Sequence, residues 1–279
     1  MVRFGPAGNA EAFYAEGHKH TYEAAEWLKK LGLSAFEYSF GRGARLKEET
    51  GAKIKDEMAR CGIAVSAHAP YYINLANDEL EKNLQYFRES TVSGGYMGAG
   101  RVVFHPGSMG KMKREQAFEK TKENLATVMK ALKGEGAQEM IYCPETMGKI
   151  NQIGTLEEIC ELCSLSDALY PAIDFGHLNS RTLGSIKGKQ DYAAILDTLK
   201  SGVGEEKYKK MHIHFSHIQY TAKGEKTHLT FEDEEWGPFF GPLAELIAER
   251  GLSPVVICES KGTQANDAAL MKKMYEEAL

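Results

Sequence analysis

Segments in which apolar and polar residues alternate recur along the chain, and segments with helical periodicity separate them. The clearest alternating segment is residues 210–218 (KMHIHFSHI), where His212, His214 and Ser216 share one side and the residues between them are apolar. Alternation with a period of two is typical of a β-strand. If the strand belongs to a barrel whose outside is covered by helices, the imidazoles face the barrel interior. There they must bind metal ions or form hydrogen bonds in a buried polar network.

Strand-like segments are each followed by a helix-like segment. The predicted strands are residues 2–5, 35–39, 63–68, 101–105, 140–145, 169–174, 210–218 and 254–259. The predicted helices are residues 21–31, a segment through 55–60 that stops at Gly62, and residues 77–97, 115–132, 155–163, 191–199, 241–250 and 266–279. Eight β-then-α units without a linker or low-complexity break predict an α/β fold, a single (β/α)8 TIM barrel that takes up residues 1–279 as one domain. A doubly wound open sheet is the alternative, although it does not require eight units and no G-x-G-x-x-G follows the first strand.

Length and composition agree with a barrel and argue against several other classes. The 279 residues are 43% hydrophobic, which suits one barrel of ~250 residues. A net charge of −5 gives no global basic field that would indicate nucleic acid. No N-terminal leader and no apolar run of the ~18–20 residues that span a membrane is expected. The odd number of cysteines fits a reducing compartment, so we expect a cytoplasmic protein. Cys160 and Cys163 lie one helical turn apart, and we expect them to pack in a helix instead of binding zinc.

Imidazoles and carboxylates gather at the predicted strand ends, where TIM barrels build their chemistry. Six consecutive strands finish in, or close to, such a residue: His68, His105, Glu145, Asp174, His214 and Glu259. His177 follows three residues after Asp174, and His228 lies in the loop after the seventh strand. A lone strand-end histidine is more often structural, but burying three carboxylates together without cations would be very costly. The mixture suits zinc, manganese or iron, and its size predicts at least two ions.

A cluster of two or more ions stabilises the attacking and leaving oxygens of a phosphoryl transfer, so the site predicts phosphate-ester hydrolysis, with metal-assisted sugar isomerisation as the alternative. Basic residues in the predicted βα loops favour a polyanionic substrate, although Lys and Arg favour loops in general. These residues are Arg42 and Arg45, Lys111 within residues 110–114, Arg181 with Lys187 and Lys189, and Lys223 with Lys226. Tyr71 and Tyr72 follow His68 closely, where they either stack beside bases or pack under the loop.

Six segments resemble, in order, the signatures of the endonuclease IV family, which are metal-dependent apurinic/apyrimidinic endonucleases on a TIM barrel. They are residues 66–76 (SAHAPYYINLA), 104–108 (FHPGS), 144–146 (PET), 174–177 (DFGH), 212–216 (HIHFS) and Glu259. The resemblance implies three divalent ions, usually zinc. It implies that His68 and His105 hold the first ion and that Glu145 bridges it to the second. It further implies that Asp174, His214 and Glu259 are ligands of the second ion, and that His177 and His228 are ligands of the third.

The chain departs from the family pattern at the third ion. The family has an aspartate two residues before the last histidine, and Lys226 occupies that position here. The third ion is therefore absent, replaced by the ammonium group, or held by Glu225 or Asp233. The family's DNA-contacting loop after the second strand is also longer than residues 41–46, so Arg42 and Arg45 are expected to contribute less to DNA binding.

The resemblance implies hydrolysis of the phosphodiester bond 5′ to abasic sites in double-stranded DNA, as in base-excision repair, leaving a 3′-hydroxyl. Glu145 is the expected catalytic residue, and the protein is expected to act as a monomer with two or three divalent ions, zinc before manganese or iron. The predicted DNA-binding residues are Arg42, Arg45, Tyr71, Tyr72, Lys111 and Lys226. One alternative is a xylose isomerase-like sugar isomerase or epimerase, with one ion on Glu145, Asp174, His214 and Glu259. The other is a DNA-binding relative that has lost catalysis.

Overall fold

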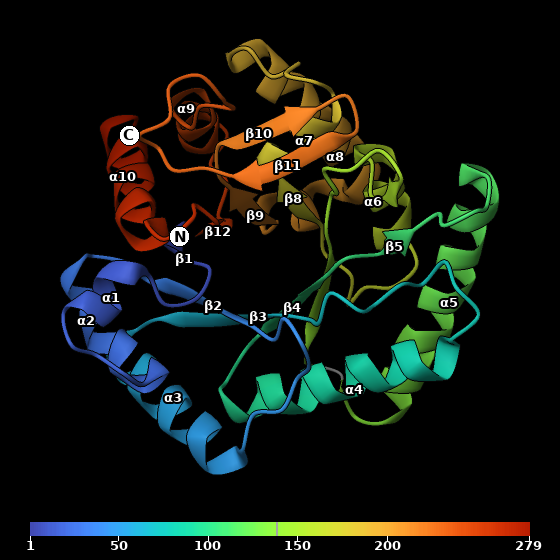
Figure 1. Cartoon of the computed structure of the whole chain (residues 1–279), viewed down its shortest axis with the longest axis horizontal. Helices are drawn as coiled ribbons and strands as arrows, with labels where there is room; N and C mark the ends of the chain where they lie inside the picture. The colour runs from blue at the N-terminus through green and yellow to red at the C-terminus, as the bar shows by residue number, and fades with distance from the viewer. Residues whose placement is uncertain (138) are drawn as a thin grey trace.

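Parallel strands form a closed barrel at the centre of the protein (Figure 1). The computed structural model describes residues 1–137 and 139–279. One four-stranded sheet has the order β1-β12-β9-β8 and the other the order β2-β3-β4-β6. Single bridges from Ala7 to Glu37 and from Glu145 to Ala172 join the two sheets at both edges. The barrel strands are β1 (Arg3–Pro6), β2 (Ala35–Ser39), β3 (Ala64–His68), β4 (Arg101–Phe104), β6 (Ile141–Pro144), β8 (Ala172–Asp174), β9 (His212–Phe215) and β12 (Val255–Cys258). The predicted α/β TIM-barrel fold is confirmed.

Helices surround the barrel and cover the apolar outer side of its strands (Figure 1). Alternation in β9 places Ile213 and Phe215 outward, and Phe215 packs edge-on against Phe240 with ring centroids 5.0 Å apart. Gly5 permits the close approach of β1 to β2, because a Cβ there would lie 1.8 Å from the Ala35 carbonyl oxygen. The helices are α1 (Glu11–Ala15), η1 (Thr21–Glu23), α2 (Ala24–Lys30), α3 (Glu48–Cys61), α4 (Leu80–Tyr96), α5 (Arg114–Gly134), α6 (Leu156–Cys163), α7 (Phe175–Arg181), α8 (Lys189–Lys209), α9 (Gly241–Glu249) and α10 (Gln264–Glu277).

Two short sheets and two helices, α1 and α7, go beyond the predicted elements. β5 (Gly107–Ser108) pairs with β7 (Gln152–Ile153), and β10 (Ile218–Thr221) pairs with β11 (Gly224–His228) as an antiparallel hairpin. The predicted strand 210–218 is therefore wrong at its end, because the chain leaves the barrel after Phe215 and starts the hairpin at Ile218. α7 begins directly at the end of β8, where the Asp174 side chain accepts the backbone N–H of His177.

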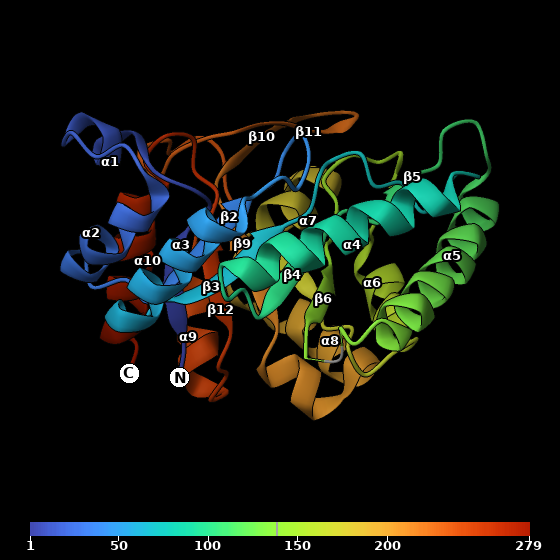
Figure 2. The ribbon, with the colours of Figure 1, turned by 90° about the horizontal axis from the view of Figure 1, so that it is seen from below.

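The carboxyl ends of the barrel strands open toward one side of the molecule. Figure 2 shows α1, β5 and the β10–β11 hairpin along one edge and both termini on the opposite side.

α6 starts with a capping box between Thr155 and Glu158, and both Cys160 and Cys163 are buried in this helix. The predicted packing role of the two cysteines is thus confirmed.

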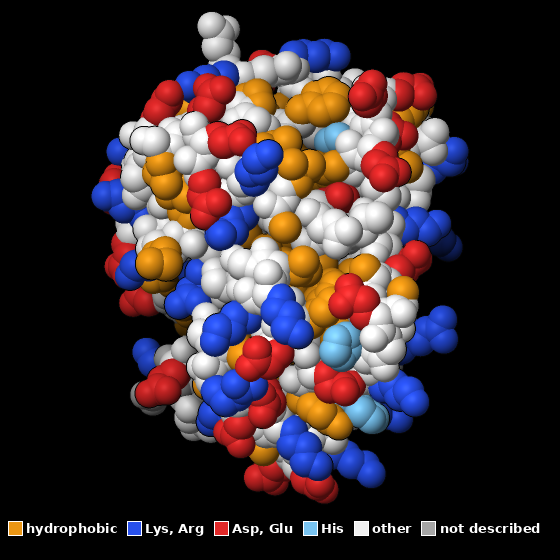
Figure 3. Space-filling view, turned by 90° about the vertical axis from the view of Figure 1, so that its left-hand side faces the viewer, with side chains coloured by type: hydrophobic (Ala, Val, Ile, Leu, Met, Phe, Trp, Pro, Cys, Tyr) orange, Lys and Arg blue, Asp and Glu red, His pale blue; other side chains and the backbone are white. Residues whose placement is uncertain are grey.

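The outer surface over α1, α2 and α10 carries basic and acidic side chains side by side (Figure 3). This mixture gives that face no continuous field of one sign. Among the helices of the described residues, none combines the length and the apolar character that crossing a membrane requires.

Candidate metal centre

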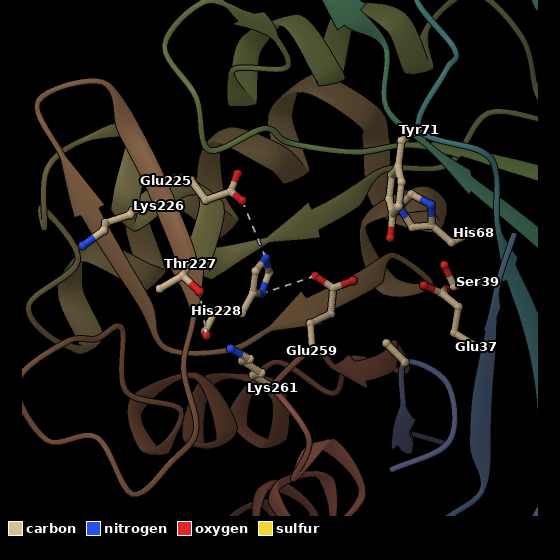
Figure 4. A pocket seen from close by; sticks show the side chains of 11 residues that line it. Glu37, Ser39, His68, Tyr71, Glu225, Lys226, Thr227, His228, Glu259 and Lys261 are labelled. Atoms are coloured by element: carbon tan, nitrogen blue, oxygen red, sulfur yellow. Dashed lines mark hydrogen bonds and ion pairs between the residues drawn. The ribbon is translucent and has the colours of Figure 1, made fainter. Parts of the chain in front are cut away.

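The barrel brings all eight predicted metal ligands to one opening. His68 ends β3 and Asp174 ends β8, while His214 lies within β9. The others directly follow a barrel strand or lie on the two elements that cover the opening: His105, Glu145, Glu259, His177 on α7 and His228 on β11. A cavity of about 460 Å³ lies over them, and Figure 4 shows side chains of His68, His228 and Glu259 turned into it. The strand-end pattern in the sequence thus corresponds to one cluster in space.

The first group consists of His68, His105 and Glu145, whose ligand atoms all lie within 4.8 Å of one another. Glu145 Oε2 lies 3.1 Å from His68 Nε2 and 3.2 Å from His105 Nε2. His68 Nδ1 lies 2.9 Å from the Ala69 carbonyl oxygen, which can only accept a hydrogen bond. The proton of the neutral ring is therefore on Nδ1, and Nε2 presents its lone pair to the centre.

The second group consists of Glu145, Asp174, His214 and Glu259. His214 Nδ1 lies 3.0 Å from Glu145 Oε1 and 3.4 Å from Glu259 Oε1. Asp174 is fully buried, and its Oδ2 has no hydrogen-bond partner among the described residues. A buried carboxylate oxygen without a donor is costly, and a cation shared by these oxygens would remove that cost. The donor set therefore fits a divalent metal ion.

The third group consists of His177, Glu225 and His228. Glu225 Oε2 lies 3.5 Å from His177 Nε2, and Glu225 Oε1 lies 3.9 Å from His228 Nε2. His177 Nδ1 donates to the Thr146 carbonyl oxygen at 2.9 Å, so that Nε2 of the neutral ring is free to bind a cation.

The hairpin explains why Glu225 joins this group and Lys226 does not. The pairing of β10 with β11 shifts register between Gln219 and Tyr220, which pair with Thr227 and Glu225. Lys226 is thus the extra residue of a β-bulge, and one extra residue puts Glu225 on the same face as His228. Figure 4 shows the Lys226 ammonium directed away from the His228 ring.

Asp233, the other candidate for this position, has a different role. Its Oδ1 accepts the backbone N–H groups of Glu235 and Trp236 at 3.1 and 2.9 Å, which stabilises the turn after the hairpin. Of the two acidic residues considered from the sequence, the structure places Glu225 with the histidines.

Replacing Glu225 by alanine is expected to remove one metal ion per chain, because the remaining His177 and His228 offer two ligands where a stable site uses about three or four. The Lys226→Ala variant is the matched control from the same strand and is expected to keep the full metal content. Elemental analysis of the purified variants after dialysis measures both. An unchanged metal content in Glu225→Ala would remove Glu225 from the site.

The ionisable groups of the centre shift one another's pKa strongly. Burial alone would raise the pKa of Glu145, but His214, His105 and His177 hold it well below its usual value. Burial alone would lower the pKa of His177 and His214, but the neighbouring carboxylates hold both well above the usual value. Glu259 has a raised pKa because of its burial and the nearby Glu145 and Asp174 charges. In the metal-free protein the rings of His177 and His214 therefore favour the positively charged form, with a proton on both nitrogens.

Metal affinity is consequently expected to increase with pH. The raised pKa of His177 and His214 means that a cation must displace their protons at neutral pH, and the apparent affinity then changes by up to ~10-fold per pH unit for each proton released. Competition with a chelator of known pH-dependent affinity, at pH 6 to 8, measures this effect. An affinity that does not change over this range would show that neither imidazole is protonated before the ion binds.

The predicted DNA-binding residues lie around the same opening or on the loops beside it. Tyr71 is 59% exposed and stacks on His105, with ring centroids 5.5 Å apart. Tyr72 is exposed and packs against Tyr86. The predicted basic residues are exposed and form no ion pair among the described residues: Arg42, Arg45, Lys111 and Lys226. Both proposed roles of the tyrosines, stacking on a ligand and packing against the loop, remain compatible with this geometry.

Three other basic residues from the predicted basic loops have structural contacts instead. Arg114 donates to the carbonyl oxygens of Ile150 and Gln152 and pairs with Glu158 at 2.7 Å. Arg181 donates to carbonyl oxygens of the same loop, and Lys189 pairs with two glutamates of α9. These contacts hold the three side chains against the protein, and their contribution to a positive rim stays a prediction.

Glu37 was missed by the sequence reasoning. It lies at the centre of β2, is 1% exposed, and contacts His212 and His214. Its only signal in the sequence was a charged residue at a strand position flanked by the apolar Ala35, Phe36 and Tyr38. Glu225 was considered only as one of several options, because a bulge cannot be inferred from the sequence.

The closed barrel with clustered histidines and carboxylates at its carboxyl ends defines the class of this protein. A family model described as xylose isomerase-like TIM barrel matches residues 25–277, and the chain belongs to this family. Individual relatives add detail. An uncharacterised protein of Methanocaldococcus jannaschii is 33% identical over 99% of this chain and 98% of its own length. A protein of Acholeplasma laidlawii named probable endonuclease 4 is 29% identical over 63% of this chain and 66% of its own length.

Solved structures share the fold. Endonuclease IV from Thermus thermophilus superposes with a TM-score of 0.71 at 20% identity, over 94% of this chain and 96% of that one. An L-ribulose 3-epimerase superposes with a TM-score of 0.67 at 12% identity, over 100% of this chain and 96% of that one. The resemblance to the endonuclease IV family inferred from the six motifs is confirmed, and the same fold also carries sugar epimerases.

Proposed function

We propose that this protein is a metal-dependent endonuclease that hydrolyses the phosphodiester bond 5′ to abasic sites in double-stranded DNA and leaves a 3′-hydroxyl. The observation that supports this most is the number of donors at the opening, which form three adjoining groups, two of which share Glu145. A sugar isomerase with one ion needs only the second group. The first and third groups would be needed in an enzyme whose several metal ions act together on one phosphate.

Each group would hold one divalent ion, with zinc as the proposed metal and manganese or iron as alternatives that the same donors accept. Bound ions would neutralise developing charge on the phosphate and lower the pKa of the attacking water. Glu145 lies between the first and second groups, and its low pKa keeps the carboxylate ionised at neutral pH. We assign it the role of orienting the attacking water and accepting its proton.

The rim supplies contacts for a polyanion. Arg42, Arg45, Lys111 and Lys226 would contact backbone phosphates, and Lys261 lines the cavity itself. An abasic nucleotide lacks a base to unstack and is extruded at lower cost than a paired nucleotide. Tyr71, which is exposed at the mouth of the cavity, would fill the space beside it. The protein is proposed to act as a monomer in the cytoplasm.

A nicking assay tests the proposal directly. The metal-loaded protein is incubated with a labelled duplex that carries one abasic site, and with the same duplex without it. We expect a single cut 5′ to the lesion and a product that a polymerase can extend, which shows the 3′-hydroxyl. If neither duplex is cut with zinc, manganese or iron, the nuclease assignment is wrong and a DNA-binding relative without catalysis is favoured.

A sugar isomerase or epimerase is the second candidate, because several structural neighbours carry such names and because the second group alone could hold one ion. Glu145, Asp174, His214 and Glu259 would be its ligands. Incubation with ketohexoses and chromatography of the epimers tests it. Turnover of a ketose, together with no DNA cleavage, would favour this candidate.

A further inference from the structure

A buried carboxylate lies against the metal centre without belonging to any of the three groups. Glu37 projects from β2 toward β9, on the wall of the cavity across from Glu259 (Figure 4). Its Oε1 lies 2.9 Å from His214 Nε2, and its Oε2 lies 3.0 Å from His212 Nε2. Ser66 on β3 donates its hydroxyl to Oε2 at 2.8 Å. Side chains from β3 and β9 therefore meet at this carboxylate.

The ring of His214 lies between two sets of carboxylates. Its Nε2 faces Glu37, and its Nδ1 faces Glu145 at 3.0 Å. A neutral imidazole carries one proton and one lone pair on its two nitrogens. Only the nitrogen with the lone pair can bind a cation, so the position of the proton decides whether His214 is a ligand.

We propose that Glu37 is a positioning residue that accepts the Nε2 proton of His214 and thereby presents Nδ1 to the second ion. The proposal rests on the metal centre of the proposed function, not on its DNA substrate. An outer carboxylate that holds a histidine ligand in one tautomer also fixes the orientation of the ring. Glu37 is itself positioned, because Ser66 donates a hydrogen bond to its other oxygen, and His212 Nε2 lies 3.0 Å from the same oxygen.

The buried polar atoms of this set support the proposal. Glu37 Oε1 and His214 Nε2 have no well-aligned hydrogen bond among the described residues, although they lie at hydrogen-bond distance. Both atoms are buried away from water and need a partner. His214 Nδ1 lies at hydrogen-bond distance from Glu145 Oε1, 3.0 Å. An ion that binds Nδ1 would displace the proton there and leave the other proton on Nε2, where a small rotation of the ring would complete the bond to Glu37.

Glu37, His212 and His214 could instead form a separate cation site, since their ligand atoms lie within 4.8 Å of one another. His214 would then have to bind ions through both nitrogens and lose its proton entirely. The hydrogen-bonded arrangement needs no such deprotonation. The two arrangements differ in metal content, which makes them separable.

Cobalt binding to the Glu37→Gln variant tests the proposal. A glutamine amide can donate to Nε2, which moves the proton to Nδ1, the atom that must bind the ion. We expect the variant to bind the same number of Co²⁺ ions at saturation as the wild type. One of them should bind about 10–100-fold more weakly, with a changed cobalt absorption spectrum. Glu37→Asp, which keeps the charge but shortens the side chain, should show the same weakening.

Glu158→Gln is the matched control, because Glu158 is also a buried glutamate but bonds to Arg114 and the start of α6. It should lose stability and keep wild-type cobalt affinity and spectrum, while circular dichroism verifies the fold of each variant. Wild-type affinity and spectrum in Glu37→Gln would overturn the proposal. So would the loss of one whole ion at saturation, which would make Glu37 a ligand. A wild-type chain that binds no cobalt would instead contradict the metal centre itself, and no outcome depends on DNA cleavage.

Discussion

The Glu145→Gln variant is expected to lose cleavage of an abasic-site duplex by a factor of ~10³ or more while its affinity for the duplex stays within a few-fold of the wild type. Glu145 is 1% exposed and contacts His68 and His105 through one oxygen and His214 through the other. A neutral amide would remove the charge shared by the first two groups and the acceptor for the proton of water. The phosphate contacts lie on the rim and are unchanged.

Single-turnover nicking and fluorescence anisotropy with the same duplex measure the two quantities separately. Glu158→Gln again serves as the control, because Glu158 is a buried glutamate that belongs to none of the ligand groups, and this variant should cut at the wild-type rate. A Glu145→Gln variant that still cuts at close to the wild-type rate would end the catalytic assignment of Glu145. A variant that loses binding as well would show that Glu145 acts through the integrity of the centre.

Removal of metal is expected to abolish cleavage and to destabilise the fold. Without cations, Glu145, Asp174 and Glu259 lie close together at the opening, and imidazoles lie beside them as counter-charges. An ion that binds the folded state alone raises stability, by about 2.7 kcal/mol at a hundred times its dissociation constant. We therefore expect dialysis against a chelator to lower the melting temperature by several degrees, and added zinc to restore both properties.

Nicking rates and thermal melts of the metal-free and reconstituted protein measure this prediction. A magnesium-only reconstitution is a useful control, since imidazole-rich sites favour zinc, manganese or iron over magnesium. Full cleavage by a protein shown by elemental analysis to be free of metal would contradict the account.

The periodicity of the sequence predicted the barrel well because each strand and helix has a regular pattern of its own. The residues 35–39 segment agrees with β2 at both ends, and most helices agree within a few residues. The pattern failed where tertiary contacts decide the path of the chain. Nothing local in residues 210–218 shows that the strand ends at Phe215, and α7 is buried almost throughout, so that it lacks an amphipathic pattern.

The candidate site was predictable to the extent that strand direction determines it. Parallel strands of a barrel bring their carboxyl ends together, so His68, Glu145 and Asp174 had to meet if the strands were right. Glu225 could not be assigned, because its face depends on the bulge at Lys226.

Two further features depend on contacts between distant segments. The role of Glu37 depends on the register between β2 and its neighbours and on the distance across the barrel to β9. The sequence placed the guanidinium of Arg181 on the basic rim. In the structure it donates hydrogen bonds to carbonyl oxygens, and most of these belong to residues more than thirty positions away along the chain. Local patterns carry no information about such partners.

The ratio of metal to protein in the purified chain tests the central claim most directly. Three adjoining groups of ligands, with Glu225 completing the third, predict three divalent ions per chain by elemental analysis. A single ion per chain, bound even when metal is supplied in excess, would contradict the multinuclear centre and favour the sugar isomerase.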